Sequence, residues 1–100
     1  MVQKNETTPL IKFNRKEYIM PKPLTSSGNK NLISERLISL RKKHHLSQRD
    51  LSNRLQLIGY DIDKNVITRI ETNKRYVTDI ELQALSIIFG VTCDYLINGD

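Results

Sequence analysis

The fold of the chain is decided by one short stretch of sequence, KNVITRIET at residues 64–72. Its apolar residues fall at positions 66, 67 and 70, and polar side chains fill the places between them. Apolar residues that return every three to four positions predict an amphipathic helix. Asp63, just before the stretch, is a favoured helix N-cap, and Asn73, just after it, tolerates the left-handed conformation that ends helices. We therefore expect a helix from about Lys64 to Thr72 with a polar outer face.

Four more helices are predicted around this one, over residues 31–44, 47–59, 78–90 and 92–96. Each begins at a residue type that caps helices, and two begin with a capping box. The expected caps are Asn31, Ser47, Thr78 and Thr92. Apolar spacing selects the expected inward residues, which are Ile33, Leu37, Leu40, Leu51, Leu55, Leu82, Leu85 and Ile88. Five short helices without a strand signal predict an all-α domain over residues 31–100.

Residues 1–30 differ from the rest of the chain and are predicted to form an extended or flexible N-terminal arm. They contain all three prolines, and a TSSG stretch at residues 25–28 is expected to act as a flexible joint. The segments LIKF (10–13) and YIM (18–20) are too apolar for a plain linker. We leave open whether the arm docks on the domain, binds a partner or lies along a nucleic acid through its lysines and arginines.

Charge is segregated along the 100 residues. Residues 41–75 hold nine Lys and Arg against four acids, whereas residues 76–100 hold four acids and no Lys or Arg. The net charge of +5 therefore gathers in one region, as expected of a face that meets a polyanion.

The single cysteine, Cys93, cannot form an internal disulfide, which favours a cytoplasmic location. No apolar run is long enough to span a membrane.

Catalytic and metal sites are not expected. The two histidines, His44 and His45, are adjacent, so they cannot share a helix face as metal ligands four residues apart would. One cysteine provides no zinc set, and no glycine-rich phosphate loop is present. We therefore predict that the protein is not an enzyme and that it uses no cofactor.

Several ordered segments resemble the Xre and phage Cro/repressor family of helix-turn-helix proteins. They are LISLRKKHHLSQRDL (37–51), VITRIETNKR (66–75), LQAL (82–85) and FGVTCDYL (89–96). The resemblance spans roughly residues 31–97 and implies a five-helix, lambda-repressor-like domain. It also implies sequence-specific binding of double-stranded DNA by a small transcriptional regulator of the repressor kind. The helix at residues 64–72 would then be the one that reads the major groove.

The residue types on that helix suit the role independently. Lysine and arginine reach guanine O6 and N7, and asparagine pairs with adenine. We expect base contacts from Lys64, Asn65 and Thr68, and either a base or a phosphate contact from Arg69. Ser47, Gln48, Lys74 and Arg75 match positions near the groove edge or the phosphates. The resemblance also implies that Arg41 and Glu71 form a structural ion pair beneath the motif.

The sequence departs from the family between the second and third helices, where residues 56–61 replace a tight turn. We expect the second helix to gain a turn, with Leu57 or Ile58 folding back on the core. Tyr60 either covers Ile62 or reaches a phosphate.

Partners follow from the same resemblance. A homodimer on a two-fold symmetric operator is expected, because a single small domain offers few base contacts. The C-terminal residues Cys93, Tyr95, Leu96 and Ile97 supply either the dimer face or ordinary core. The alternative function is an interaction module of the antitoxin or phage-antirepression type that binds a protein partner through the arm.

Overall fold

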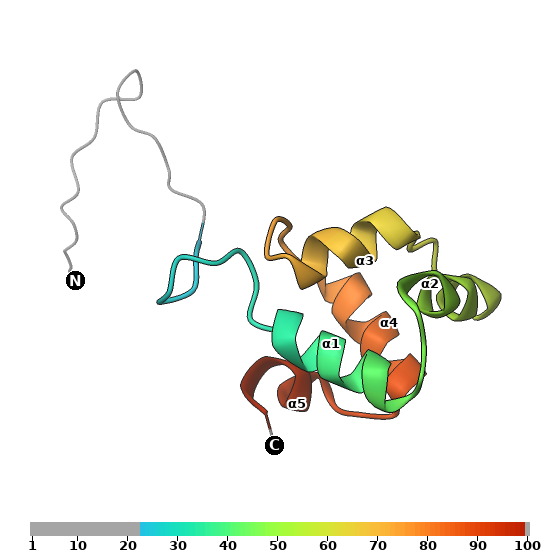
Figure 1. Cartoon of the computed structure of the whole chain (residues 1–100). Helices are drawn as coiled ribbons and strands as arrows, with labels where there is room; N and C mark the ends of the chain where they lie inside the picture. Colours follow the sequence, from blue (N-terminus) through green and yellow to red (C-terminus); the bar gives the residue numbers. More distant parts are fainter. Residues whose placement is uncertain (1–22, 100) are drawn as a thin grey trace, which may run out of the picture.

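The structure is a computed structural model that describes residues 23–99, and these residues form five α-helices without a β-strand (Figure 1). The predicted all-α fold is confirmed. Predictions that concern residues 1–22, including the role of their basic and apolar segments, lie outside the described residues. The helices are α1 (Ser34–Lys43), α2 (Gln48–Leu57), α3 (Lys64–Glu71), α4 (Asp79–Phe89) and α5 (Cys93–Asn98).

Four of the five helices begin at the caps that the sequence predicts. The side chains of Ser47, Asp63, Thr78 and Thr92 each accept a hydrogen bond from the backbone N–H three residues further on. Each bond satisfies one of the N–H groups that a helix start leaves without a partner. Helices α2 and α4 carry complete capping boxes. The expected end of α3 is also present, because Asn73 adopts a positive φ of 60° just after the C-cap.

The start of α1 differs from the prediction. The helix begins at Ser34 with Ile33 as its N-cap, whose own side chain makes no cap bond, although Asn31 Oδ1 accepts a hydrogen bond from the Ile33 N–H at 3.1 Å. Asn31 is buried and also donates hydrogen bonds from Nδ2 to the backbone oxygens of Ile70 (3.0 Å) and Arg75 (3.1 Å). The Ile70 oxygen is one of the last carbonyls of α3 and also accepts from the Asn73 N–H at 3.1 Å, so Asn31 is its second donor. The amide of Asn31 thus fastens the start of the domain to the end of α3.

The joint between α2 and α3 also differs from the prediction. Helix α2 does reach Leu57, but the Leu57 side chain is 85% exposed and Ile58 is 45% exposed, so neither folds back on the core. Leu57 stands two residues beyond the buried Leu55, which on a helix turns it to the opposite side. Ile62 fills the core instead, and the Ser52 hydroxyl closes the joint by donating to its carbonyl oxygen at 2.9 Å. Tyr60 is half-buried against the core, as one of the two expectations proposed.

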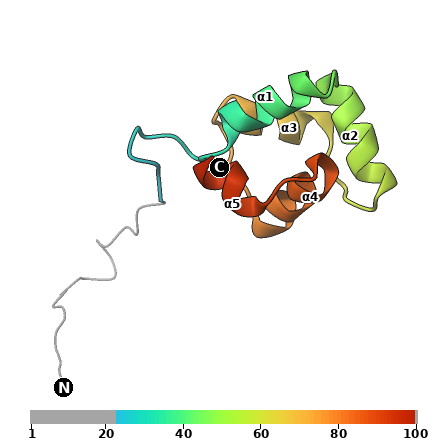
Figure 2. The same cartoon turned by 90° about the horizontal axis from the view of Figure 1, so that it is seen from below.

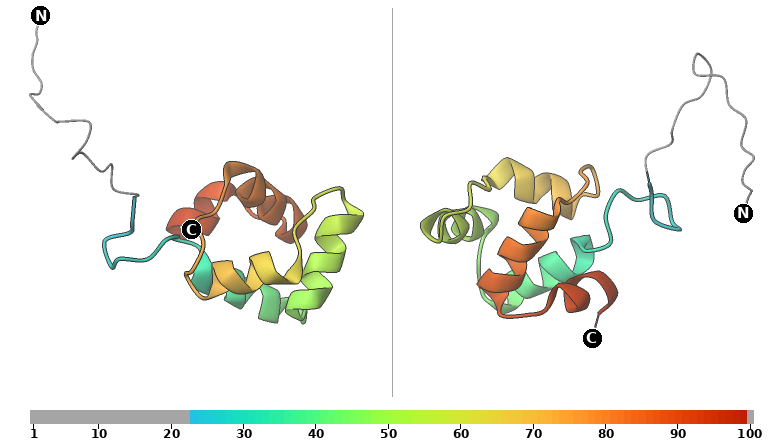
Figure 3. Two further views of the ribbon diagram at one scale, coloured as in Figure 1. Left: turned by 90° about the horizontal axis from the view of Figure 1, so that it is seen from above. Right: turned by 180° about the vertical axis from the view of Figure 1, so that it is seen from behind.

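The helices surround one core, and α3 lies on the outside of it. Helix α3 packs against α1 and α2, and no described helix covers it from above (Figures 1 and 3). The view from below shows α4 and α5 opposite α1 and α3, with α2 at one end, where it contacts α4 (Figure 2). The buried apolar side chains are Ile33, Leu37, Leu40, Leu46, Leu51, Leu55, Ile62, Ile67, Ile70, Ala84, Leu85, Phe89 and Leu96. Leu82 and Ile88, both expected inside, are only partly buried against this core.

Helix α5 completes the core beneath α1. Leu96 is fully buried, so it is core and supplies no dimer face. Arg36 of α1 donates from Nη1 to the backbone oxygens of Leu96 (3.2 Å) and Ile97 (3.3 Å), which fixes the C-terminal turn. Within residues 23–99, no helix has the length and apolarity to cross a membrane.

The hydrogen bonds from Asn31 to the Ile70 and Arg75 oxygens lead to a prediction about stability. Asn31→Ala removes the side-chain donor of the Arg75 oxygen and one of the two donors of the Ile70 oxygen, so we expect it to lower the free energy of unfolding by about 1–3 kcal/mol. Urea denaturation of the full chain measures the change. The control is Asn53→Ala, an exposed asparagine of α2, for which a change within about 0.5 kcal/mol is expected. Equal midpoints for the two variants would contradict the assignment.

Candidate nucleic-acid interface

The outer face of α3 consists of Lys64, Asn65, Thr68 and Arg69. Lys64, Asn65 and Arg69 are exposed, whereas Thr68 is half-buried. The opposite side of the helix buries Ile67 and Ile70, which hold α3 on the core. The polar side chains therefore lie on the outer side of a helix that no other described helix overlies (Figure 3).

Thr68 and Gln48 are joined to each other rather than free. The Thr68 hydroxyl lies 2.7 Å from Gln48 Oε1 and 3.0 Å from the backbone oxygen of Lys64. Gln48 in turn donates from Nε2 to Glu71 Oε1 at 2.8 Å. The first residue of α2 thus bridges the middle and the end of α3. This bridge was not expected from the sequence, because residues 20 and 23 positions apart show no local pattern.

Arg41 and Glu71 lie together beneath the outer face, as the resemblance implied. Arg41 donates from Nε to Glu71 Oε2 (2.7 Å) and from Nη2 to Oε1 (3.0 Å), and Nη1 reaches the backbone oxygen of Leu46 (3.0 Å). The side chains are only 13% and 5% exposed. The hydrogen bond to Glu71 raises the pKa of the Arg41 guanidinium, which favours its charged form. The fork geometry fixes α1 against α3.

The start of α2 is occupied by its own capping box. The Ser47 hydroxyl accepts from the Asp50 N–H at 2.9 Å, and the Ser47 N–H donates to Asp50 Oδ2 at 3.1 Å. The hydrogen bonds from Ser47 lower the pKa of the Asp50 carboxyl below its usual value. Ser47 is exposed and lies beside Gln48, so its position is on the α3 side of the domain although its side chain serves as a cap.

The loop that follows α3 holds its two basic residues differently. Lys74 is exposed, whereas the Arg75 guanidinium forms an ion pair with Glu81, the carboxylate of the α4 capping box. Asn73 donates to the Ser34 hydroxyl at 3.0 Å, and the oxygen of Arg75 is held by Asn31. The loop is thereby fastened to the beginning of α1 and to α4. Of its cations, Lys74 is the one left facing solvent.

Comparison with known proteins identifies the family. A family model described as helix-turn-helix (HTH_3) matches residues 37–96, which is more than half of the chain. The chain belongs to this helix-turn-helix family. The resemblance to Xre-type proteins stated from the sequence is confirmed. No curated protein matches the chain.

Two solved structures resemble this helix-turn-helix domain. The P22 c2 repressor, crystallised in complex with the synthetic operator 9T in the presence of Tl⁺, has a TM-score of 0.59 and 27% sequence identity. The match covers 70% of this chain and 98% of that one. The DNA-binding domain of BldD has a TM-score of 0.59 and 25% identity, over 73% of this chain and 99% of the other.

The buried pair of the helix-turn-helix domain makes the second prediction. Arg41→Ala leaves the buried Glu71 carboxylate without its ion-pair partner, and we expect a loss of about 3 kcal/mol in the free energy of unfolding. The double variant Arg41→Met/Glu71→Leu removes both charges and should recover most of that loss. Thermal and urea unfolding check both values.

The matched control for this prediction is Arg69→Ala, which removes an exposed arginine from the same side of the domain. Its stability should stay within about 0.5 kcal/mol of the parent chain. If Arg41→Ala were as stable as Arg69→Ala, the pair would not hold α1 against α3.

Proposed function

We propose that the chain is a DNA-binding transcriptional regulator that reads a specific double-stranded sequence and acts as a repressor. The observation that carries the proposal is the outer face of α3, a row of polar side chains on the outermost helix of a helix-turn-helix domain. A recognition helix needs such a face, because base edges in the major groove are read by hydrogen-bonding side chains. The solved neighbours are a repressor with its operator and a DNA-binding domain, which supports the same conclusion.

Base reading is assigned to the exposed part of the outer face. Lys64 and Asn65 occupy the first turn of α3, the part of a recognition helix that enters deepest into the groove. Lys64 suits guanine and Asn65 suits adenine, and Arg69 reaches a guanine or a phosphate. Thr68 acts together with Gln48, because the bond between their side chains sets the direction in which the Thr68 methyl and the Gln48 amide face.

Phosphate contacts are assigned to the two ends of the motif. Lys74 is exposed after α3, and Ser47 is the N-cap of α2, where the backbone N–H groups of a helix start favour an anion. Arg75 contributes mainly through the ion pair with Glu81, which sets the loop that carries Lys74. These contacts position the protein and carry no sequence information themselves.

A homodimer is part of the proposal, since two copies double the base contacts at half-sites about one helical turn apart. Cys93, Tyr95 and Ile97 are the half-buried residues of the predicted dimer face that remain accessible to a second copy, since Leu96 is buried in the core. Sedimentation velocity with and without the selected duplex tests the stoichiometry.

A protein partner for the arm remains the alternative, and co-purification with and without residues 1–28 tests it.

Selection of bound duplexes from random DNA tests the function. We expect one enriched site with two-fold symmetry and an affinity that falls steeply with salt, as several phosphate contacts require. Enrichment of no sequence, or binding that salt does not weaken, would contradict the proposal.

Variants of the selected complex separate base readers from phosphate contacts. Lys64→Ala and Asn65→Ala should each cost about 1–3 kcal/mol on the selected site and relax the preference at one base pair. Lys74→Ala should weaken all duplexes alike and reduce the salt slope by about 0.9. Fluorescence anisotropy on selected and scrambled duplexes measures both effects. Lys42→Ala on α1 is the control, for which neither effect is expected.

A further inference from the structure

Lys30 is an exposed cation outside the helix-turn-helix motif, yet its position is fixed. Its ammonium Nζ lies 5.6 Å from the centroid of the Tyr76 ring. A cation at this distance from an aromatic face is attracted by the ring. Tyr76 is half-buried in the loop between α3 and α4, where it stands between Arg75, which is paired with Glu81, and Val77, which packs against the core.

The backbone on both sides of Lys30 is also tied down. On one side, the Asn29 N–H donates to Thr25 Oγ1 at 2.9 Å and closes a turn over residues 25–29. On the other side, the buried Asn31 binds the oxygens of Ile70 and Arg75. Asn31, the neighbour of Lys30, is thus hydrogen-bonded to the loop that contains Lys74, although 44 residues separate the two lysines.

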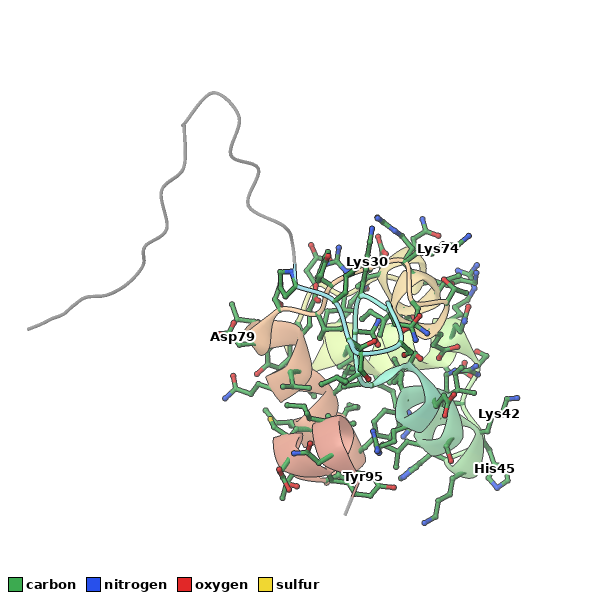
Figure 4. The ribbon with its side chains drawn as sticks, turned by 90° about the vertical axis from the view of Figure 1, so that its left-hand side faces the viewer. Lys30, Lys42, His45, Lys74, Asp79 and Tyr95 are labelled. Carbon is green, nitrogen blue, oxygen red and sulfur yellow. The ribbon has the colours of Figure 1, made fainter. Side chains whose placement is uncertain are left out.

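Lys30 and Lys74 lie on the same side of the domain. Figure 4 shows both at the upper edge, which is the edge of α3, whereas Lys42 and His45 lie lower on a flank and Tyr95 lies at the bottom. The loop at residues 72–77 contains no acidic residue. The nearby Glu81 is already paired with Arg75. A phosphate near Lys74 therefore meets no uncompensated negative charge from this loop.

We propose that Lys30 is a further contact to the DNA backbone, which extends the interface from the helix-turn-helix motif to the segment before α1. This inference rests on the proposed function. An ammonium group on a flexible stem binds phosphate oxygens as a point charge and does not distinguish bases. Lys30 thus adds affinity and orientation without sequence preference. The Tyr76 ring keeps its charge over the α3–α4 loop before DNA arrives.

The test is the salt dependence of binding by the full-length Lys30→Gln variant on the selected duplex and on a scrambled duplex. One lost phosphate contact lowers the slope of log affinity against log salt by about 0.9. Between about 50 and 200 mM salt, the variant should therefore lose ~3.5-fold less affinity than the parent chain. Both duplexes should be affected alike, and Lys30→Arg should restore the parent slope.

Lys42→Gln is the matched control, because it makes the same change in net charge on a flank of the domain. We expect it to keep the parent slope, and we expect both glutamine variants to unfold at the parent midpoint. A parent slope in Lys30→Gln would overturn the contact, as would equal slope changes in the two variants, since these report net charge alone. If the parent chain itself bound no DNA, the proposed function would fail and this inference with it.

Discussion

The carboxylate of Glu71 is the point at which three helices are joined. Arg41 of α1 gives it two hydrogen bonds, Gln48 of α2 gives it a third, and α3 carries it. A carboxylate with 5% of its surface exposed needs compensation, so moving any of the three helices has a cost in buried charge. The rotation of α3 about its own axis, and with it the direction of the outer face, is thereby fixed from below.

Local features of the sequence predicted most of the fold. A cap and its N–H partner stand three residues apart, so Ser47, Asp63, Thr78 and Thr92 could be assigned without knowledge of the tertiary structure. Apolar spacing likewise identified the residues that fill the centre of the core. The same reasoning missed the second role of Asn31, because an amide whose oxygen accepts from a nearby N–H still has two N–H groups that can bind carbonyls across the domain. It failed for Leu57 because an apolar residue type alone does not determine which side of a helix it occupies.

The residues of the candidate site could be predicted from the sequence, but the hydrogen bonds and ion pairs between them could not. The residue types on α3 and the family resemblance together indicated the outer face and the pair of Arg41 and Glu71. Three contacts had no signal in the sequence: the Gln48–Thr68 bond, the Arg75–Glu81 ion pair and the fastening of the α3–α4 loop by Asn31. Two of them link residues 20 or more positions apart. The Arg75 pair spans a loop whose path no periodicity describes.

The joint between α2 and α3 has a consequence for the length of the chain. The Ser52 hydroxyl and the Ile62 carbonyl close it at its base, while Leu57, Ile58 and Gly59 form a tip that is exposed to solvent. Extra residues at this tip would leave the closing bond in place, and each doubling of a loop costs only about 0.6 kcal/mol of closure entropy. The tip is therefore the natural point of insertion for a fluorescent label or a second domain, and the place where this chain has room to diversify without turning α3.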